Sequence, residues 1–156
     1  MIERYTLPEM GQIWTEHAKF QSWLEVEIAA CQANCELGLL SKEDLKQIQE
    51  KAQFNVSRIK EIEKEVKHDV IAFLTNVNEY VGDSGRFIHV GMTSSDVLDT
   101  GLSLQLKAAC NLLLDEIGKL EKEVRLLASK HKETIMIGRS HAIHGEPISF
   151  GFKLAG

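Results

Sequence analysis

The 156-residue sequence has few of the residues that interrupt helices or cross-link small domains. It contains only two prolines, Pro8 and Pro147, and three cysteines. Because proline is the strongest helix breaker, the long interval between the two prolines favours helix. Three cysteines are an odd number and make no disulfide framework. Cys31 and Cys35 stand one helical turn apart in an apolar segment, which favours buried thiols.

The sequence also lacks an excess of positive charge and any long apolar run. Lys plus Arg number 18 against 23 Asp plus Glu, a formal net charge of −5. A nucleic-acid binder needs clustered basic groups to neutralise phosphates, so nucleic acid is not expected as a partner. No run approaches the ~20 apolar residues that span a bilayer, and the first residues carry charges where a signal peptide would be apolar. We therefore expect a cytoplasmic protein that does not bind membranes.

Helical periodicity dominates the first half of the sequence. The pattern predicts three helices: one from Ile13 to Leu37, a short one after Ser41, and one from near Ile59 through His68 to Val81. Gly38 is a C-terminal stop for the first helix, and residues 41–44 supply an N-cap and an acidic first turn for the second. The glycines of residues 82–85 end the third helix, and a brief extended piece is expected at 87–90.

A much longer helix is predicted over residues 96–131, with apolar residues spaced close to 3.6 apart from Leu98 to Leu127. It would be about 54 Å long at ~1.5 Å per residue, whereas a compact chain of this size has a radius of gyration of about 15 Å. Four leucines lie off the main stripe: Leu104, Leu112, Leu114 and Leu126. The helix is therefore apolar on more than one side and needs several packing partners.

The last residues, 150–156, look like the opening turns of another helix. Together with the long helix, they predict that the chain is a fragment, or that it completes its core by oligomerising, and we favour both. The predicted fold class is all-α.

Motifs for phosphate and metal binding are weak. The glycine spacings fit neither the dinucleotide fingerprint nor the Walker loop, so nucleotide binding would need another route. His141 and His144, with Glu146 beyond, could suggest metal ligands, but an HxxH pair outside an HExxH context is a poor indicator of zinc. We expect no metal.

Three histidines sit beside polar groups at predicted segment ends: His68, His89 and His141. Imidazole titrates near neutrality, which makes them candidates for acid–base work, although capping or surface roles are the alternative. Residues 93–96 (Thr-Ser-Ser-Asp) precede the long helix. They fit a capping box, and equally an anion site, because free N–H groups at a helix start attract carboxylates and phosphates.

Four segments together resemble the fumarase/aspartase superfamily, and within it the branch that acts on adenylosuccinate. They are ERYTLPEM at 3–10 with Ile13-Trp14, KHDVIAF at 67–73, HVGMTSSDVLDT at 89–100 and GRSHAIHGEP at 138–147. Asp96 stands where fumarases and aspartases usually carry Asn, and the Arg4-Tyr5 opening is characteristic of the adenylosuccinate branch. The departures are Ser140 for Thr, Ala142 for Gly and Gly145 for Ala.

The resemblance implies a C–N lyase that eliminates fumarate from adenylosuccinate to give AMP, and from the related succinyl-carboxamide ribotide of purine biosynthesis. It implies no metal or organic cofactor, and a homotetramer for the full-length enzyme. It assigns residues 1–95 to an N-terminal helical domain and residues 96–156 to the incomplete start of a central helical bundle. The family's loop with the serine that acts as base would lie beyond residue 156, so the 156-residue chain alone is expected to be inactive.

The resemblance also implies site residues. His141 would be the general acid that protonates the departing nitrogen, and His68 would hold the substrate and tune that acid. The implied substrate-binding residues are Arg4, Tyr5, Lys67, His68, Asp69, His89, Thr93 and Ser94. Arg4 and Tyr5 would bind the phosphate, Thr93 and Ser94 a carboxylate, and His89 either a phosphate or only its structural neighbours. Two other interpretations stay open: a non-catalytic helical assembly module, or another lyase of the superfamily.

Overall fold

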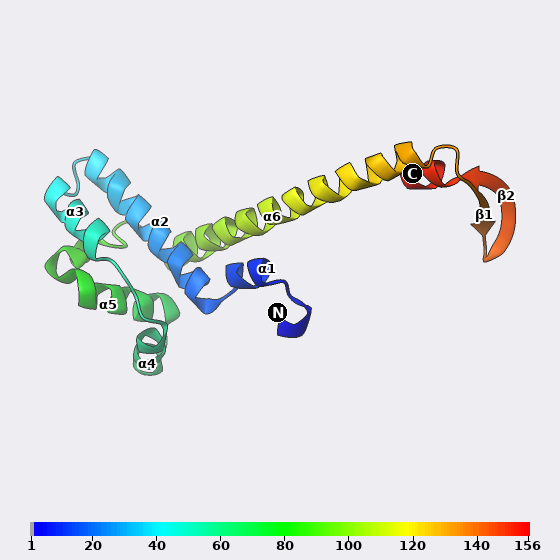
Figure 1. Cartoon of the computed structure of the whole chain (residues 1–156). Helices are drawn as coiled ribbons and strands as arrows, with labels where there is room; N and C mark the ends of the chain where they lie inside the picture. Colours follow the sequence, from blue (N-terminus) through cyan, green and yellow to red (C-terminus); the bar gives the residue numbers. More distant parts are fainter. Residues whose placement is uncertain (1) are drawn as a thin grey trace. The chain divides into compact units, whose positions relative to one another are not determined.

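The computed structural model (Figure 1) describes residues 2–156. The chain divides into two compact units, Met1–Ala109 (unit 1) and Cys110–Gly156 (unit 2). The elements in chain order are η1 (Glu3–Tyr5), α1 (Pro8–Ile13), α2 (Glu16–Glu36), α3 (Lys42–Lys51), α4 (Val56–Val66), α5 (Asp69–Val81), η2 (Gly82–Phe87), α6 (Ser94–Lys130), β1 (Ile135–Ser140), β2 (Ile143–Ser149) and α7 (Phe150–Ala155). The predicted all-α class is confirmed, and the described residues add one two-stranded sheet. In this part of the chain, no helix is both long and apolar enough to cross a membrane.

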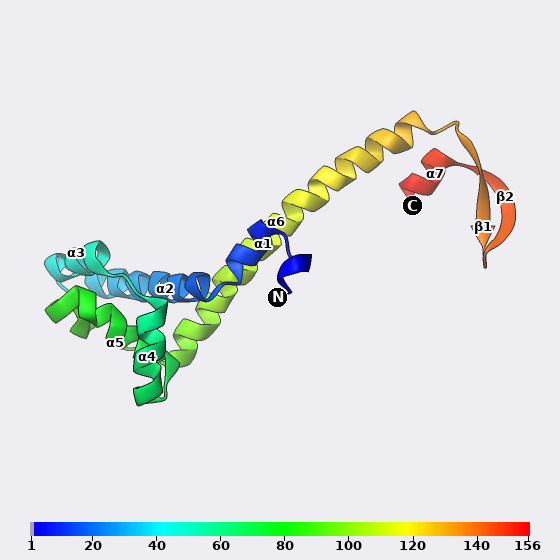
Figure 2. The same ribbon diagram turned by 60° about the horizontal axis from the view of Figure 1, so that its bottom comes forward.

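The core of unit 1 lies among α2, α3, α4 and α5, which Figure 2 shows clustered together. Phe20 and Trp23 of α2 meet Phe73 of α5, with ring centroids 5.7 Å and 5.6 Å apart, the first pair stacked and the second edge-on. All three side chains are buried. Buried aromatic rings contribute a large share of the apolar area in a small core. This contact therefore holds α5 against α2. It also positions residues 67–69, which lie at the start of α5.

The single helix predicted from residue 59 to Val81 is wrong, because the chain breaks between α4 and α5. Lys67 adopts a left-handed conformation, φ 56°, and His68 is extended. The Ile71 N–H donates a 3.4 Å hydrogen bond to Nδ1 of His68, so the imidazole caps α5. Neither glycine nor proline marks this break. The helical periodicity of the sequence therefore gave no sign that the helix ends here.

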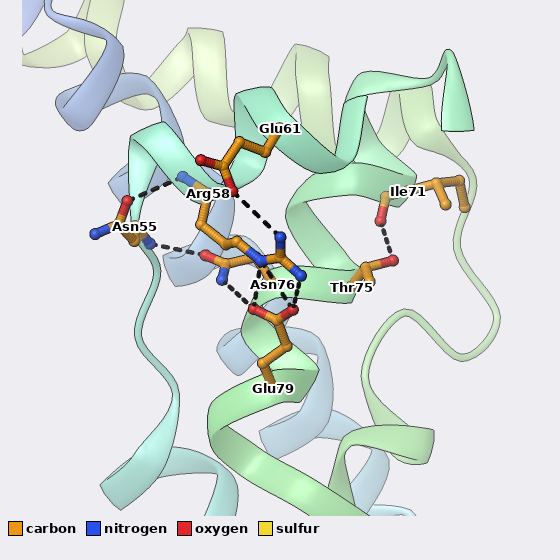
Figure 3. Close-up of polar contacts among 7 residues, drawn as sticks. All are labelled: Asn55, Arg58, Glu61, Ile71, Thr75, Asn76 and Glu79. Carbon is orange, nitrogen blue, oxygen red and sulfur yellow. Dashed lines mark hydrogen bonds and ion pairs between the residues drawn. The ribbon is translucent and has the colours of Figure 1, made fainter. Parts of the chain in front are cut away.

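A polar network ties the start of α4 to α5 (Figure 3). Asn55 caps α4 by accepting from the Arg58 N–H at 3.0 Å, and its own N–H donates to Oδ1 of the buried Asn76 at 2.7 Å. Nη2 of Arg58 lies 2.7 Å from Oε1 of Glu79, to whose other oxygen Asn76 donates at 2.9 Å. These hydrogen bonds, the one from Arg58 first, hold the pKa of Glu79 below its ordinary value. The network holds the start of α4 on α5, at a point away from residues 67 and 68, where the chain passes from α4 to α5.

Other boundaries also differ from the predicted pattern. The first long helix does not start at Ile13: α1 ends there, and Thr15 starts α2 by accepting from the Ala18 N–H. Gly38 has φ 77° and follows the end of α2 as predicted. The extended piece predicted at 87–90 is wrong, since η2 continues to Phe87 and a turn follows it. Ser41 caps α3 as predicted, accepting from the Asp44 N–H.

Unit 2 contains a β-hairpin that the sequence analysis did not predict. β1 pairs antiparallel with β2, from Ile135 opposite Ser149 to Ser140 opposite Ile143. His141 and Ala142 form the two-residue turn, and both have positive φ, 51° and 61°. Two-residue hairpin turns with positive φ match the twist of the strands, but Asn-Gly is their usual sequence. His-Ala is an unusual sequence for such a turn, so nothing in the sequence signalled a hairpin.

The predicted final helix is confirmed as α7, which packs on the end of α6 within unit 2. The Phe150 N–H donates to the Thr134 carbonyl at 2.7 Å, and the Gly151 N–H donates to the His131 carbonyl at 2.8 Å. A Cβ on Gly151 would lie 2.4 Å from the Ala128 carbonyl oxygen. Glycine is therefore required for this close approach of two backbones.

Candidate functional site

Arg4 and Tyr5 form an exposed cationic and aromatic pair in η1. The guanidinium carbon of Arg4 lies 4.7 Å from the centroid of the Tyr5 ring, and both residues are exposed. No salt bridge among the described residues involves Arg4, so its fork of donors is available to an external anion. A stacked guanidinium suits bidentate recognition of a phosphate or carboxylate.

The corner between α4 and α5 presents Lys67, His68 and Asp69 together. His68 Nδ1 accepts the Ile71 N–H, so in the neutral ring the proton lies on Nε2, which is assigned here from the hydrogen bond. Asp69 Oδ1 accepts the Val70 N–H at 2.8 Å and lies 3.5 Å from His68 Nδ1. Lys67 and His68 are exposed. The corner therefore offers a lysine and an N–H donor to solvent, with one carboxylate beside them.

At the start of α6, the Asp96 side chain reaches back to Thr93, which is one half of a capping box. The backbone N–H and the hydroxyl of Thr93 both donate to Oδ2 of Asp96, at 2.7 Å and 3.0 Å. These bonds, the backbone one first, hold the pKa of Asp96 below its ordinary value. Within the described part of the chain, the Ser94 hydroxyl has no hydrogen-bond partner. Of the two residues predicted to hold a carboxylate, Ser94 has a free hydroxyl, whereas Thr93 is committed to Asp96.

His89 contacts a residue that the sequence analysis missed. Its Nδ1 lies 2.6 Å from Oε1 of Glu27, whose side chain is 1% exposed. Burial raises the pKa of Glu27, and the hydrogen bond to His89 opposes that rise. One feature of the sequence could have revealed Glu27: it is a carboxylate on the apolar stripe of α2, between Trp23 and Cys31 at spacings of four.

His141 lies on the exposed turn of the hairpin in unit 2, with the left-handed backbone described above. His144, the other half of the HxxH pair, stands on β2 opposite Arg139. Among the described residues no three His, Cys, Asp or Glu side chains are grouped as metal ligands would be.

The predicted site residues are thus divided between the two units. Unit 1 contains the Arg4 pair, the Lys67 corner, His89 and the start of α6, and unit 2 contains His141. No hydrogen bond or ion pair in the described chain joins the Arg4 pair, the corner and the start of α6 to one another. The roles assigned to these residues stay predictions.

Comparisons with known proteins place the sequence among lyases. The profile of a family described as lyase matches residues 3–156. The chain is 62% identical over 156 residues to an adenylosuccinate lyase of Synechocystis sp., covering 100% of this chain and 36% of that protein. It is 50% identical over 155 residues to an adenylosuccinate lyase of Bacillus subtilis, covering 99% and 36%. The chain therefore spans about a third of the length of these curated relatives.

A solved structure shares the fold. The crystal structure of 3-carboxy-cis,cis-muconate lactonizing enzyme from Pseudomonas putida matches with a TM-score of 0.87 at 28% sequence identity. The match covers 97% of this chain and 36% of that one. Similarity to this structure therefore extends over both units.

Proposed function

The chain belongs to this lyase family, and we propose that it is the N-terminal part of an adenylosuccinate lyase. The proposed reaction eliminates fumarate from adenylosuccinate to give AMP, and from the succinyl-carboxamide ribotide in purine biosynthesis. The 62% identity to the Synechocystis enzyme over the whole chain is the observation that supports it. Identity to the muconate enzyme, 28%, is far lower, which favours adenylosuccinate over the substrate of that relative.

The elimination needs one proton removed and one supplied. A base takes the proton from the carbon next to a carboxylate, the electron pair forms the new C=C bond, and the C–N bond breaks. The departing purine nitrogen must receive a proton, because an amine anion is a very poor leaving group. We assign this proton to His141, which stands on an exposed turn. The base is expected from residues outside this chain.

The other site residues are assigned to binding and orienting the substrate. Arg4, stacked on Tyr5, is assigned to the phosphate, and the free Ser94 hydroxyl at the N-terminus of α6 to a carboxylate, with Thr93 beside it. At the corner, His68 Nε2–H is assigned to the substrate because Nδ1 is occupied by its cap. Lys67 adds positive charge there.

We propose a cytoplasmic homotetramer for the complete protein. Six large apolar side chains are exposed on α6 after Ala109: Leu113, Leu114, Ile117, Leu120, Leu126 and Leu127. An exposed apolar patch of this kind favours an interface between copies of the chain.

Two variants of the complete protein, meaning this chain with the further residues its relatives carry, test the assignment of His141. His141→Gln should lower kcat for fumarate release by roughly 10²-fold or more and leave KM nearly unchanged. His144→Gln is the matched control, since it makes the same change three residues away on the same hairpin. Equal effects of the two substitutions, or a raised KM with normal kcat, would reject His141 as the acid.

A second test, with one variant, separates capping from chemistry at the corner between α4 and α5. His68→Asn keeps a side-chain acceptor at the N-cap, so the melting temperature should change little, whereas turnover should fall. Unchanged turnover would remove His68 from the site.

The alternatives give distinct results. A wild-type complete protein that releases no fumarate from adenylosuccinate but turns over 3-carboxy-cis,cis-muconate would be another lyase of the superfamily. Turnover of neither substrate would indicate the assembly module.

A further inference from the structure

One face of α2 holds the segment that connects η2 to α6, residues 88–93. The residues of this face stand at spacings of four and three, which places them on one side of a helix. They make three contacts with residues 87–90: Glu27 with the His89 ring, Cys31 with the Phe87 carbonyl, and Asn34 with the Val90 carbonyl. The position of the connecting segment therefore depends on polar side chains of α2.

The segment needs such contacts because its backbone is strained. His89 has φ 69°, which is unfavourable for a residue with a side chain, and Gly91 has φ 80°. Strained backbone persists only where its surroundings hold it in place. Thr93, at the end of the segment, donates to the Asp96 side chain at the start of α6. Loosening of the segment would therefore also reach the first turn of α6.

The Glu27 contact differs from the other two because it includes a buried ionisable carboxyl group. Glu27 is 1% exposed, and its Oε1 lies 2.6 Å from Nδ1 of His89. Its Oε2 is buried and has no hydrogen-bond partner among the described residues. Asn34 does not titrate, and burial raises the pKa of the Cys31 thiol to about 11, so that thiol keeps its proton at neutral and acid pH. Acid can therefore weaken only the Glu27 contact of the three.

The strength of this contact depends on how many protons the pair carries. An ionised Glu27 accepts from Nδ1–H of either a neutral or a charged ring, and a protonated Glu27 can donate to Nδ1 of a neutral ring. When both groups are protonated, a mostly buried imidazolium faces a neutral carboxyl group, and the attraction between opposite charges is lost. Protonation of both partners therefore weakens the contact, whichever tautomer the neutral ring adopts.

The balance of effects on Glu27 gives the same sign. Burial raises the pKa of Glu27, and the contact with His89 opposes that rise. The contact thus favours the ionised carboxylate, and by linkage a proton on Glu27 disfavours the contact. Because the pKa of Glu27 remains above its ordinary value, proton uptake begins at a higher pH than for an exposed glutamate.

A charged group of α6 also faces the pair. The charge of His89 acts on Asp96, whose hydrogen bonds with Thr93 hold its pKa below the ordinary value. Asp96 therefore stays ionised while Glu27 takes up its proton. Its charge attracts an imidazolium throughout that pH range, so it does not supply the pH dependence.

We propose that the Glu27–His89 contact is an acid-sensitive switch, which holds residues 88–93 on α2 at neutral pH and releases them when both side chains are protonated. This inference goes beyond the proposed function and does not depend on it. Release lets the strained backbone at His89 relax and loosens the start of α6.

Hydrogen exchange of the complete protein tests the switch. Mass spectrometry of a peptide that contains residues 88–93, at about pH 7.5 and about pH 5, gives protection after correction for the intrinsic pH dependence of exchange. Protection should be about 10-fold lower at the acid pH, the loss of charge assistance in one hydrogen bond. Protection of α5 should change by less than about twofold. No change in the segment, or an equal fall in α5, would overturn the proposal.

Two glutamine variants assign the effect to one carboxyl group. Glu27→Gln keeps the shape of the side chain but cannot titrate, so protection of the segment should be low and nearly equal at both pH values. Glu25→Gln is the matched control, since it makes the same change on the exposed face of α2, and it should keep the acid loss. A pH dependence that persists in Glu27→Gln, or disappears in Glu25→Gln, would reject the switch.

Two further measurements do not require Glu27→Gln to fold. Asn34→Ala removes an uncharged contact, so it should lower protection by the same factor at both pH values and keep the roughly 10-fold acid loss. A lost pH dependence in Asn34→Ala would contradict the role of charge. Carboxyl ¹³C NMR of the wild-type chain should show Glu27 taking up its proton between about pH 7.5 and about pH 5. A Glu27 that stays ionised over this range would refute the proposal.

Discussion

The two halves of α6 differ in burial although they share one helix and a similar apolar content. In the first half, Val97, Gly101, Gln105 and Ala109 are buried at a strict spacing of four. After Ala109 no residue of α6 is buried, and Leu114 and Leu120 are each 65% exposed. Periodicity specifies a helix and its apolar stripe, but the stripe becomes a core only where other segments pack on it.

Particular contacts make the first half a core. A Cβ on Gly101 would lie 2.8 Å from Cδ1 of the buried Trp23, so the backbone of α6 lies directly against that ring. Gln105 donates from Nε2 to the Ile13 carbonyl at the end of α1, at 2.6 Å. By contrast, a Cβ on Gly118 would meet nothing within 4 Å. The comparison therefore predicts unequal responses to the same chemical change.

The largest difference should appear in thiol alkylation. Cys31 is buried and Cys110, at the start of the second half, is exposed. In a dilute solution of the 156-residue chain, Cys110 should react with iodoacetamide at least ~10³-fold faster than Cys31. The reaction of Cys31 is slower because the core must first open to expose its thiol. Peptide mass spectrometry over time measures both rates. Equally slow reaction of Cys110 would show that another copy covers the second half.

A smaller difference is expected in alkaline stability. Burial, and then the charge of Glu27, raise the pKa of Cys31 from 9.0 to about 11. The native thiol therefore keeps its proton where the unfolded thiol loses it, so this group's contribution is full below pH 9 and is lost as the pH rises to about 11. The loss amounts to up to ~3 kcal/mol at 1.36 kcal/mol per pKa unit. Urea unfolding at pH 8 and pH 10.5 measures it.

Cys31→Ala should weaken that alkaline loss, and Cys110→Ala, at the exposed position, is the control. An identical pH dependence of the unfolding free energy in wild type and Cys31→Ala would contradict the assigned burial effect.

The glycines of α6 give the third comparison. Gly101→Ala should lower the free energy of unfolding by about 1–3 kcal/mol, because Trp23 must move to admit the methyl group. Gly118→Ala should instead raise it by about 0.5–1 kcal/mol through helix propensity. Thermal and urea unfolding compare both variants. A stabilising Gly101→Ala would mean that α6 does not press on the Trp23 ring.

Sequence pattern predicted those parts of the fold that depend on local periodicity and ordinary caps. The Ser41 cap, the Gly38 stop and the long helix from the 93–96 cap segment all follow from such features, and the structure confirms them. Sequence pattern did not predict the break at Lys67 or the His141-Ala142 turn, because each has a positive φ at a residue type that seldom adopts it. Tertiary packing has to stabilise such conformations, and a single sequence does not display it.

The candidate site shows the same division. Motif resemblance selected Arg4, His68 and His89, and the structure adds a local geometry for each. Glu27 has no motif of its own, since its role depends on a contact with a residue 62 positions away. A carboxylate on an apolar helical stripe is the one sequence feature that could have pointed to it.

The smallest effect on the single chain, but the most direct test of the comparison, concerns the exposed leucines of the second half. Leu114→Lys combined with Leu120→Lys should change the unfolding free energy of the isolated chain by no more than about 0.5 kcal/mol per site, because both side chains are exposed. The same variant should lose self-association and binding of a hydrophobic dye, since large exposed apolar patches drive both. Asn111→Lys adds a charge at an exposed polar position of the same half and should alter neither. Sedimentation velocity and dye fluorescence at micromolar concentration distinguish the variants. If the wild-type chain is a monodisperse monomer that binds no dye, these leucines are stable when exposed to solvent. That result would contradict the proposed interface.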